Sequence, residues 1–151
     1  MTDRFSSRAD WMGLLARSAP AALAEHWEAL GLAPAFAWLR PPEIGSVMVR
    51  GRAGGAGKPF NLGEMTVTRC ALRLEAGDIS GHAYVQGRDR AHARRAALVD
   101  ALMQTDAAGR MRRAILEPLA ARLAAAQAGE AARAESTRVD FFTLARGEDE
   151  T

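Results

Sequence analysis

Two strand-like runs joined by a tight turn constrain the fold of this chain most strongly. Residues 65–74 and 79–86 are rich in β-branched and apolar side chains, and Ala76-Gly77-Asp78 between them is typical of a turn. The simplest arrangement of the two runs is an antiparallel hairpin. A glycine-rich loop at residues 54–58 precedes the hairpin and Gly87 follows it, so this stretch predicts a sheet at the centre of the fold.

Side chains of the first run alternate between the two faces of the predicted sheet. Cys70 shares one face with Thr68 and Leu72, whereas Arg69 lies on the other. Cys70 is the only cysteine, so the chain cannot form an intramolecular disulfide or a cysteine metal cluster. It is either a half-buried apolar residue or a nucleophile, and its position in the strand favours the apolar interpretation.

The N-terminal region predicts a helical hairpin. Ser6 or Ser7 can cap a first helix that carries Trp11 on its apolar face. Pro20 suits the first turn of a second helix, and Gly31 suits a left-handed stop at its end. Two strands are expected next, at residues 35–40 and 44–52, because Pro41-Pro42 should break the run between them.

The C-terminal half predicts two helices. The first begins near Arg88 and runs to about Gln104, and the second follows Gly109, with a kink or a boundary at Pro118. Residues 120–134 are alanine-rich and have only a thin apolar stripe. They therefore indicate a surface or projecting helix, unless a partner covers it.

Apolar side chains gather again just before an acidic tail. The residues of this terminal docking segment are Arg138, Val139, Asp140, Phe141, Phe142 and Leu144. The segment either completes the domain's own core or docks on another subunit, and both alternatives stay open.

Composition agrees with a single α+β domain over residues 1–151, ordered from about 6 to 147. We expect an N-terminal helical hairpin, a mainly antiparallel sheet of about four strands, two C-terminal helices and the docking segment. Of 151 residues, 48% are hydrophobic and 25% are charged, which is ordinary for one globular domain. Acidic residues are scattered among the basic ones, so nucleic acid is not an expected partner. No run is long enough to cross a membrane, and a cytoplasmic location is expected.

The glycine loop invites comparison with a phosphate-binding loop, since Gly54, Gly55 and Gly57 allow backbone N–H groups to converge on an anion. The Walker pattern fails, because Arg52 stands where it requires glycine and Pro59 stands where it requires serine or threonine. Two interpretations remain. The loop is a mobile connection at a hairpin tip, or it contacts an anion or a partner.

Arginines at the start of the first C-terminal helix suggest an anion-binding region. A helix N-terminus presents free N–H groups, and Arg88, Arg90 and His92 surround this one in the sequence. With Arg69 and the loop glycines, they are the candidates for contact with an anion or substrate. The alternative is a solvated helix start capped by Asp89. Neither a metal-ligand spacing among the histidines nor a nucleophile motif is present, so no catalytic residue is assigned and no metal is expected.

Four sequence blocks, in order, resemble the PhnG family, and the likeness runs from the Trp11 helix to Arg146. The blocks are residues 54–69 (GGAGKPFNLGEMTVTR), 84–89 (YVQGRD), 100–103 (DALM) and 136–143 (STRVDFFT). The resemblance implies the G subunit of the bacterial carbon–phosphorus lyase system. Its expected partners are the H, I and J subunits of the core complex and, functionally, the L subunit.

The resemblance also implies a reaction. The complex joins methylphosphonate to the ribose carbon of MgATP and releases adenine, giving α-D-ribose 1-methylphosphonate 5-triphosphate. MgATP is thus a substrate of the complex, and this chain is expected to bind no cofactor and to be inactive alone. The family offers no catalytic residue to carry over. The chain then either shapes a neighbouring subunit's site, with Arg69, Arg88 and Arg90 near charge, or acts purely as a structural adaptor. An independent enzyme is the least favoured role.

Overall fold

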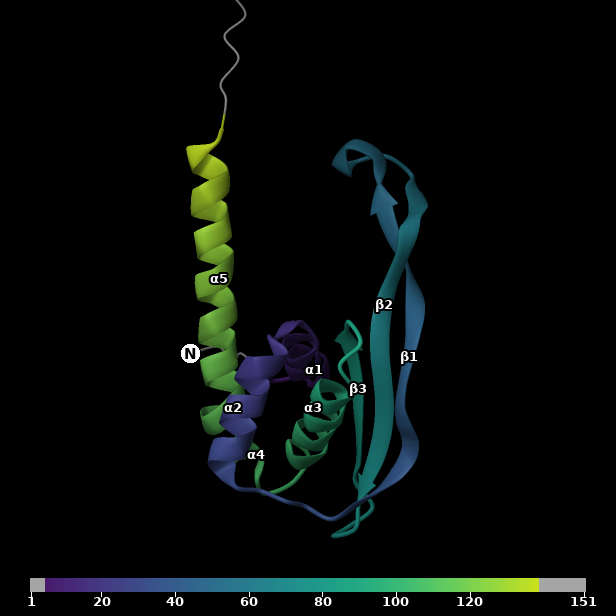
Figure 1. Ribbon diagram of the computed structural model, residues 1–151, viewed down its shortest axis with the longest axis vertical. Coiled ribbons are helices and arrows are strands. Elements are labelled where there is room, and N and C mark those ends of the chain that lie inside the picture. The colour runs from purple at the N-terminus through teal and green to yellow at the C-terminus, as the bar shows by residue number, and fades with distance from the viewer. Residues whose placement is uncertain (1–4, 139–151) are drawn as a thin grey trace, which may run out of the picture.

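Helices cover one face of a three-stranded antiparallel sheet in the computed structural model, which describes residues 5–138 (Figure 1). In chain order the main elements are α1 (Arg8–Arg17), α2 (Pro20–Leu30), β1 (Phe36–Arg52), β2 (Pro59–Leu74), β3 (Ser80–Gln86), α3 (Arg90–Leu102), α4 (Ala108–Met111) and α5 (Glu117–Ser136). The predicted α+β class is confirmed. The sheet has three strands, however, where about four were expected.

The two predicted N-terminal helices form. The Ser7 hydroxyl accepts a hydrogen bond from the Asp10 backbone N–H at 3.3 Å, and the Asp10 carboxylate accepts one from the Ser7 N–H at 3.0 Å. This reciprocal cap satisfies two N–H groups that the helix itself leaves free. Pro20 lies in the first turn of α2, and Gly31 ends that helix with a φ of 60°.

The expected break at Pro41-Pro42 is wrong, because β1 is one continuous strand. In the strand order β1-β2-β3, β1 forms an edge of the sheet. Its pairing with β2 shifts register between Trp38 and Arg40 and again between Arg40 and Glu43, so the two prolines fall within irregularities. An edge position and a bulge are where a strand tolerates residues without an N–H donor.

β2 is longer than predicted and makes a long hairpin with β1. It begins at Pro59 rather than at Met65. β3 pairs only with residues 67–73 of β2, as the predicted second hairpin. The remaining parts of β1 and β2, residues 45–66 with their connecting turn, form a two-stranded ribbon that extends beyond β3 (Figure 1). We call this ribbon the arm.

The core lies between the sheet and the helices. The fully buried large apolar side chains come from α1, α2, β2 and the C-terminal helical region; they are Leu15, Leu23, Leu72, Met111, Ile115, Leu116 and Leu119. Cys70 is buried among core residues, which confirms its apolar interpretation. Gly81 of β3 packs directly on α3, where a Cβ atom would lie about 2.0 Å from the Ala97 carbonyl oxygen.

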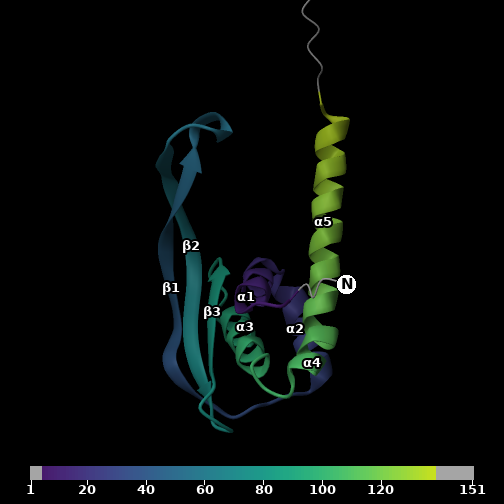
Figure 2. The same ribbon diagram turned by 180° about the vertical axis from the view of Figure 1, so that it is seen from behind.

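The C-terminal helices end in a projecting segment, as predicted. A π-helical turn, Arg112–Leu116, leads into α5, and Pro118 lies in the first turn of that helix. Every residue from 124 to 138 is exposed. Figures 1 and 2 show that this part of α5 projects from the body in the same direction as the arm. Residues 139–144 of the predicted docking segment lie outside the described residues; Arg138 is exposed.

Candidate functional site

The turn between β3 and α3 places Arg88 and Arg90 on the protein surface. Gly87 has a φ of 93°, a conformation that favours glycine, and it directs the chain out of β3. The Thr68 hydroxyl donates to the Gly87 carbonyl at 2.7 Å and fixes this turn to β2. Both arginines are exposed, and neither forms an ion pair within residues 5–138. They are therefore accessible to an external anion.

His92 lies inside the protein, away from the surface that carries Arg88 and Arg90. Its side chain is 1% exposed, and Nε2 is 2.9 Å from the Leu15 carbonyl oxygen. The carbonyl can only accept, so Nε2 carries a hydrogen. The His92 backbone N–H donates to the Asp89 carboxylate at 2.8 Å, which caps α3 as the alternative interpretation expected. His92 therefore joins α3 to the last turn of α1.

Arg69 lies on the sheet face that the helices leave open. Its Nε donates to Glu43 at 3.2 Å and its Nη1 donates to the Tyr84 hydroxyl at 3.3 Å. These three side chains come from three neighbouring strands, since Arg69 is paired with Glu43 in β1 and with Tyr84 in β3. The hydrogen bond to Tyr84, followed by the one to Glu43, raises the pKa of Arg69. Arg69 is thus engaged within the chain.

The glycine loop forms the tip of the arm. Gly54 and Gly55 have φ values of 58° and 79°, and Arg52 Nη1 donates to the Gly57 carbonyl at 3.2 Å. Gly87 hydrogen-bonds with Thr66, seven residues along β2 from the strand start at Pro59. At about 3.3 Å per residue, that separation is roughly 23 Å. The structure therefore does not bring the loop glycines together with Arg88 and Arg90.

A buried carboxylate that the sequence did not single out ties three elements together. Asp100 of α3 is fully buried and accepts from Arg8 Nε at 3.0 Å and from Trp11 Nε1 at 2.9 Å. Its other oxygen accepts from Arg8 Nη2 at 2.6 Å and from the His82 backbone N–H at 2.8 Å. The hydrogen bond to Asp100 raises the pKa of Arg8. Four donors satisfy the buried charge, so this cluster is structural.

A small apolar pocket lies between α1 and β3. It has a volume of about 210 Å³, and its walls include Met12, Leu15, Tyr84 and Val85. None of the predicted anion candidates lines it. Within residues 5–138, no group of three His, Cys, Asp or Glu side chains is placed to hold a metal ion. No helix in the same range is long and apolar enough to cross a membrane.

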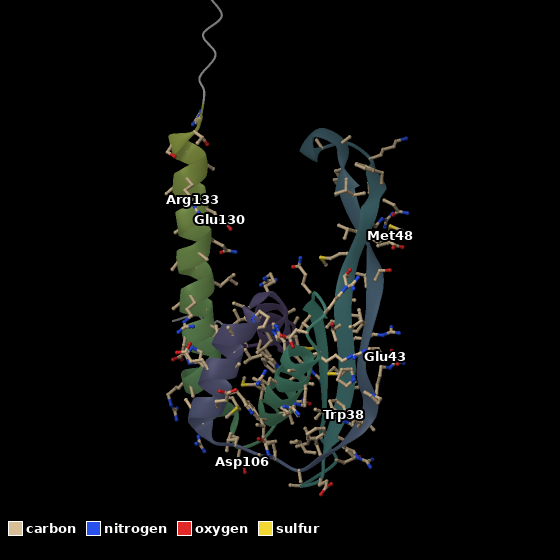
Figure 3. All side chains as sticks on the ribbon, viewed as in Figure 1. Trp38, Glu43, Met48, Asp106, Glu130 and Arg133 are labelled. Carbon is tan, nitrogen blue, oxygen red and sulfur yellow. The ribbon has the colours of Figure 1, made fainter. Side chains whose placement is uncertain are left out.

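The arm exposes large apolar side chains. Met48, Phe60 and Leu62 are 53%, 45% and 65% exposed, and no residue from 45 to 66 is buried. Figure 3 shows Met48 on the arm, and Glu130 and Arg133 on the projecting part of α5. Apolar surface that a chain leaves uncovered on a projecting element is typical of an interaction site.

Comparison with known proteins gives one consistent result. The sequence model of the family described as "Phosphonate metabolism protein PhnG" matches residues 6–147. A curated relative from Rhizobium meliloti (strain 1021) is 47% identical over 144 residues, which cover 95% of this chain and 92% of the relative. That relative is named alpha-D-ribose 1-methylphosphonate 5-triphosphate synthase subunit PhnG. The match spans nearly all of both chains, so it includes the arm, the β3–α3 turn and α5.

Proposed function

Because this chain belongs to the PhnG family, we propose that it is a non-catalytic or accessory subunit of the carbon–phosphorus lyase complex in phosphonate catabolism. It supports formation of α-D-ribose 1-methylphosphonate 5-triphosphate from MgATP and methylphosphonate, with release of adenine. The observation that carries this proposal is the 47% identity, over 95% of the chain, to a named subunit of that synthase.

The proposed partners are the H, I and J subunits, with the L subunit acting in the same reaction in the cytoplasm. MgATP is a substrate of the whole complex, and this chain holds no cofactor of its own. Several charged side chains are paired within the fold, as Arg8 is with Asp100 and Arg95 with Glu28. The exposed elements are the arm, the end of α5 and the β3–α3 turn. That distribution favours a role through contact with other subunits.

Within this role, Arg88 and Arg90 are the residues we propose to lie near a neighbouring subunit's substrate. Both are exposed and unpaired within residues 5–138, whereas Arg69 already contacts Glu43 and Tyr84. ATP and phosphonate are both anionic, so two guanidinium groups at the edge of a site would help to position them. The second version of the proposal is a purely structural adaptor that touches no substrate.

Reconstitution tests the accessory role. Adenine release from MgATP is measured with methylphosphonate and with water as acceptors, using the complete set of subunits and the same set without this chain. We expect methylphosphonate-dependent release to require the chain. Equal release without it contradicts the proposal, and turnover by the isolated chain would show an independent enzyme instead.

A double variant separates the two versions. Arg88→Ala with Arg90→Ala is expected to lower the rate of methylphosphonate-dependent adenine release about tenfold, while assembly stays intact. That loss corresponds to an activation barrier raised by about 1.4 kcal/mol. Arg94→Ala is the matched control, since Arg94 is an exposed arginine farther along α3. Unchanged adenine release in the double variant would contradict a role near the substrate and would favour the structural adaptor.

A further inference from the structure

We propose that the arm, residues 45–66, docks into an apolar groove with an acidic rim on another protein subunit of the complex. This inference rests on the proposed function, since it assumes that the chain works within an assembly. Within the arm, the sequence suggested contact with an anion or a partner only for the glycine loop at the tip, and this inference adds the two strands that lead to it. The predicted docking residues, 138–142 and 144, follow α5 in the sequence.

The body of the protein supports the arm at its base, where the Gly87 N–H donates to the Thr66 carbonyl at 2.9 Å and Gly45 pairs with Val67. Beyond that point β3 has ended and the two strands of the arm pair with each other. None of residues 45–66 is buried. An isolated two-stranded hairpin is marginally stable in water, because it orders backbone without burying apolar surface. Contact with a partner would supply the missing burial.

Apolar side chains gather near the tip of the arm. Phe60 is opposite Gly51 in the strand register, and Leu62 lies beside them, at the register shift. A Cβ atom added to Gly51 would lie 3.7 Å from Leu62 Cβ and 3.8 Å from Phe60 Cζ, so both side chains lie over this glycine. A large aromatic and a large aliphatic residue held together on a projecting strand pair are suited to anchor an interface.

The charge of the arm identifies the chemistry of the surface that it binds. Arg50, Arg52 and Lys58 are exposed on it, against a single acidic residue, Glu64. Three positive charges and one negative charge leave a net charge of +2 around the apolar anchors. The complementary surface is therefore an apolar groove bordered by carboxylates. A second copy of this chain is disfavoured, because symmetric pairing of two arms would bring like charges together.

Substitution of the anchors tests the docking. The full-length chain is immobilised, and its dissociation constant for the assembled H, I and J subunits is measured by interferometry. Phe60→Ser with Leu62→Ser is expected to weaken binding at least about tenfold. Leu39→Ser is the matched control, because Leu39 is 53% exposed on β1 outside the arm. It should change binding less than about twofold.

Charge reversal tests the acidic rim. Arg50→Glu is expected to weaken binding about fivefold at low salt, with a smaller effect at high salt. Arg94→Glu, a reversal at an exposed arginine on α3, should have a smaller effect. Circular dichroism melting of each variant checks the fold, and the melting temperature should not change because no substituted side chain is buried.

The outcomes separate this inference from the proposed function. If the wild-type chain does not bind the other subunits, the proposed function fails. If the wild-type chain binds and the arm variants bind equally well, only the docking of the arm is overturned. It is also overturned if the complex assembles normally while the arm variants abolish a homodimer seen by ultracentrifugation. Arm-dependent pelleting with anionic phosphatidylserine vesicles, with assembly unchanged, would likewise overturn it.

Discussion

Asp100 shows how one residue can decide the relative positions of three elements. Its carboxylate accepts hydrogen bonds from Arg8 of α1 and from the backbone of β3. Arg8 Nη2 also donates to the Ser80 carbonyl at 3.2 Å, which links α1 to β3 a second time. A buried charge with every acceptor site used is costly to disturb, because the donors around it lose a hydrogen-bond partner. The cluster thus fixes how α1 approaches the edge of the sheet.

Asp100→Asn is expected to destabilise the protein by about 3 kcal/mol. The amide keeps the size of the side chain but replaces one carboxylate oxygen with an NH₂ group. In one orientation the NH₂ group faces Arg8 and the His82 N–H, and in the other it faces Arg8 and Trp11. All of these groups are donors, so the NH₂ group finds no acceptor in either orientation. Urea unfolding followed by circular dichroism measures the change. Asp78→Asn is the control, since Asp78 is 94% exposed in its ion pair with Arg73 and should cost under about 0.5 kcal/mol. Equal stabilities of the two variants would contradict the structural role of Asp100.

Burial raises the pKa of the Cys70 thiol from 9.0 to about 11. The thiol stays protonated in the folded protein while the unfolded chain deprotonates, so the contribution of Cys70 to stability is full below about pH 9 and is lost as the pH rises toward 11. We expect iodoacetamide to modify native protein very slowly at pH 8 and rapidly in 8 M urea. In Cys70→Ala, the free energy of unfolding should fall less between pH 9 and 11 than it does in the wild-type protein. Rapid labelling of the native protein would show that the thiol is accessible.

The sequence could indicate Asp100 but not its partners. An aspartate within the apolar run at residues 96–103 signals a buried carboxylate, since such a helix face otherwise turns inward. Arg8 and Trp11, however, are about ninety positions away in the chain, and no local pattern connects them. His92 was misplaced for a related reason. Helical spacing puts it on a face with Arg88 and Arg95, but the packing of α1 against α3 buries it.

Helices and turns followed from local chemistry, whereas strand continuity did not. The cap at Ser7 and the stop at Gly31 depend on neighbouring residues, so the sequence predicted both correctly. Pro41-Pro42 breaks a central strand but not an edge strand, and the position of β1 at the edge is a property of the whole sheet. The early start of β2 was missed because residues 59–64 have no buried face to produce an alternating pattern.

β3 and α3 approach each other closely at Gly81, and Gly81→Ala is expected to destabilise the fold by about 2 kcal/mol or more. The added methyl group would overlap the Ala97 carbonyl and approach Ala101, so strand and helix must separate. Gly45→Ala is the matched control, because no atom lies within 4 Å of a Cβ there. Thermal unfolding of both variants measures the difference. Similar melting temperatures would show that α3 shifts at little cost.

At the scale of the whole molecule, the protein is a small body with two projections that point the same way (Figures 1 and 2). The arm continues the sheet and α5 continues the helical layer, so both are anchored in the core at one end. Two attachments on one rigid body raise each other's effective concentration when they reach the same partner. Weak contacts at each projection can then add up to a stable subunit.

Truncation after Glu135 tests whether the chain beyond α5 serves this body or a partner. Leu123 is the last residue of α5 that packs on the core, and the thirteen residues from 124 to 136 carry the chain about 20 Å farther. We therefore expect the melting temperature to change by less than about 2 °C, while co-purification with the I subunit is lost. A large drop in melting temperature would instead show that the removed segment completes the core. Unchanged co-purification would contradict the adaptor role of that segment.

Lys58, at the tip of the arm, is the only lysine in the chain. The other basic side chains are nineteen arginines and three histidines, which form no stable product with amine-directed reagents, so such a reagent modifies a single side chain within the described fold. A fluorophore on Lys58 would change its emission when the surroundings of the tip change. A bifunctional crosslinker attached there would couple to the nearest neighbouring lysine, and mass spectrometry of the product would identify the subunit that carries it.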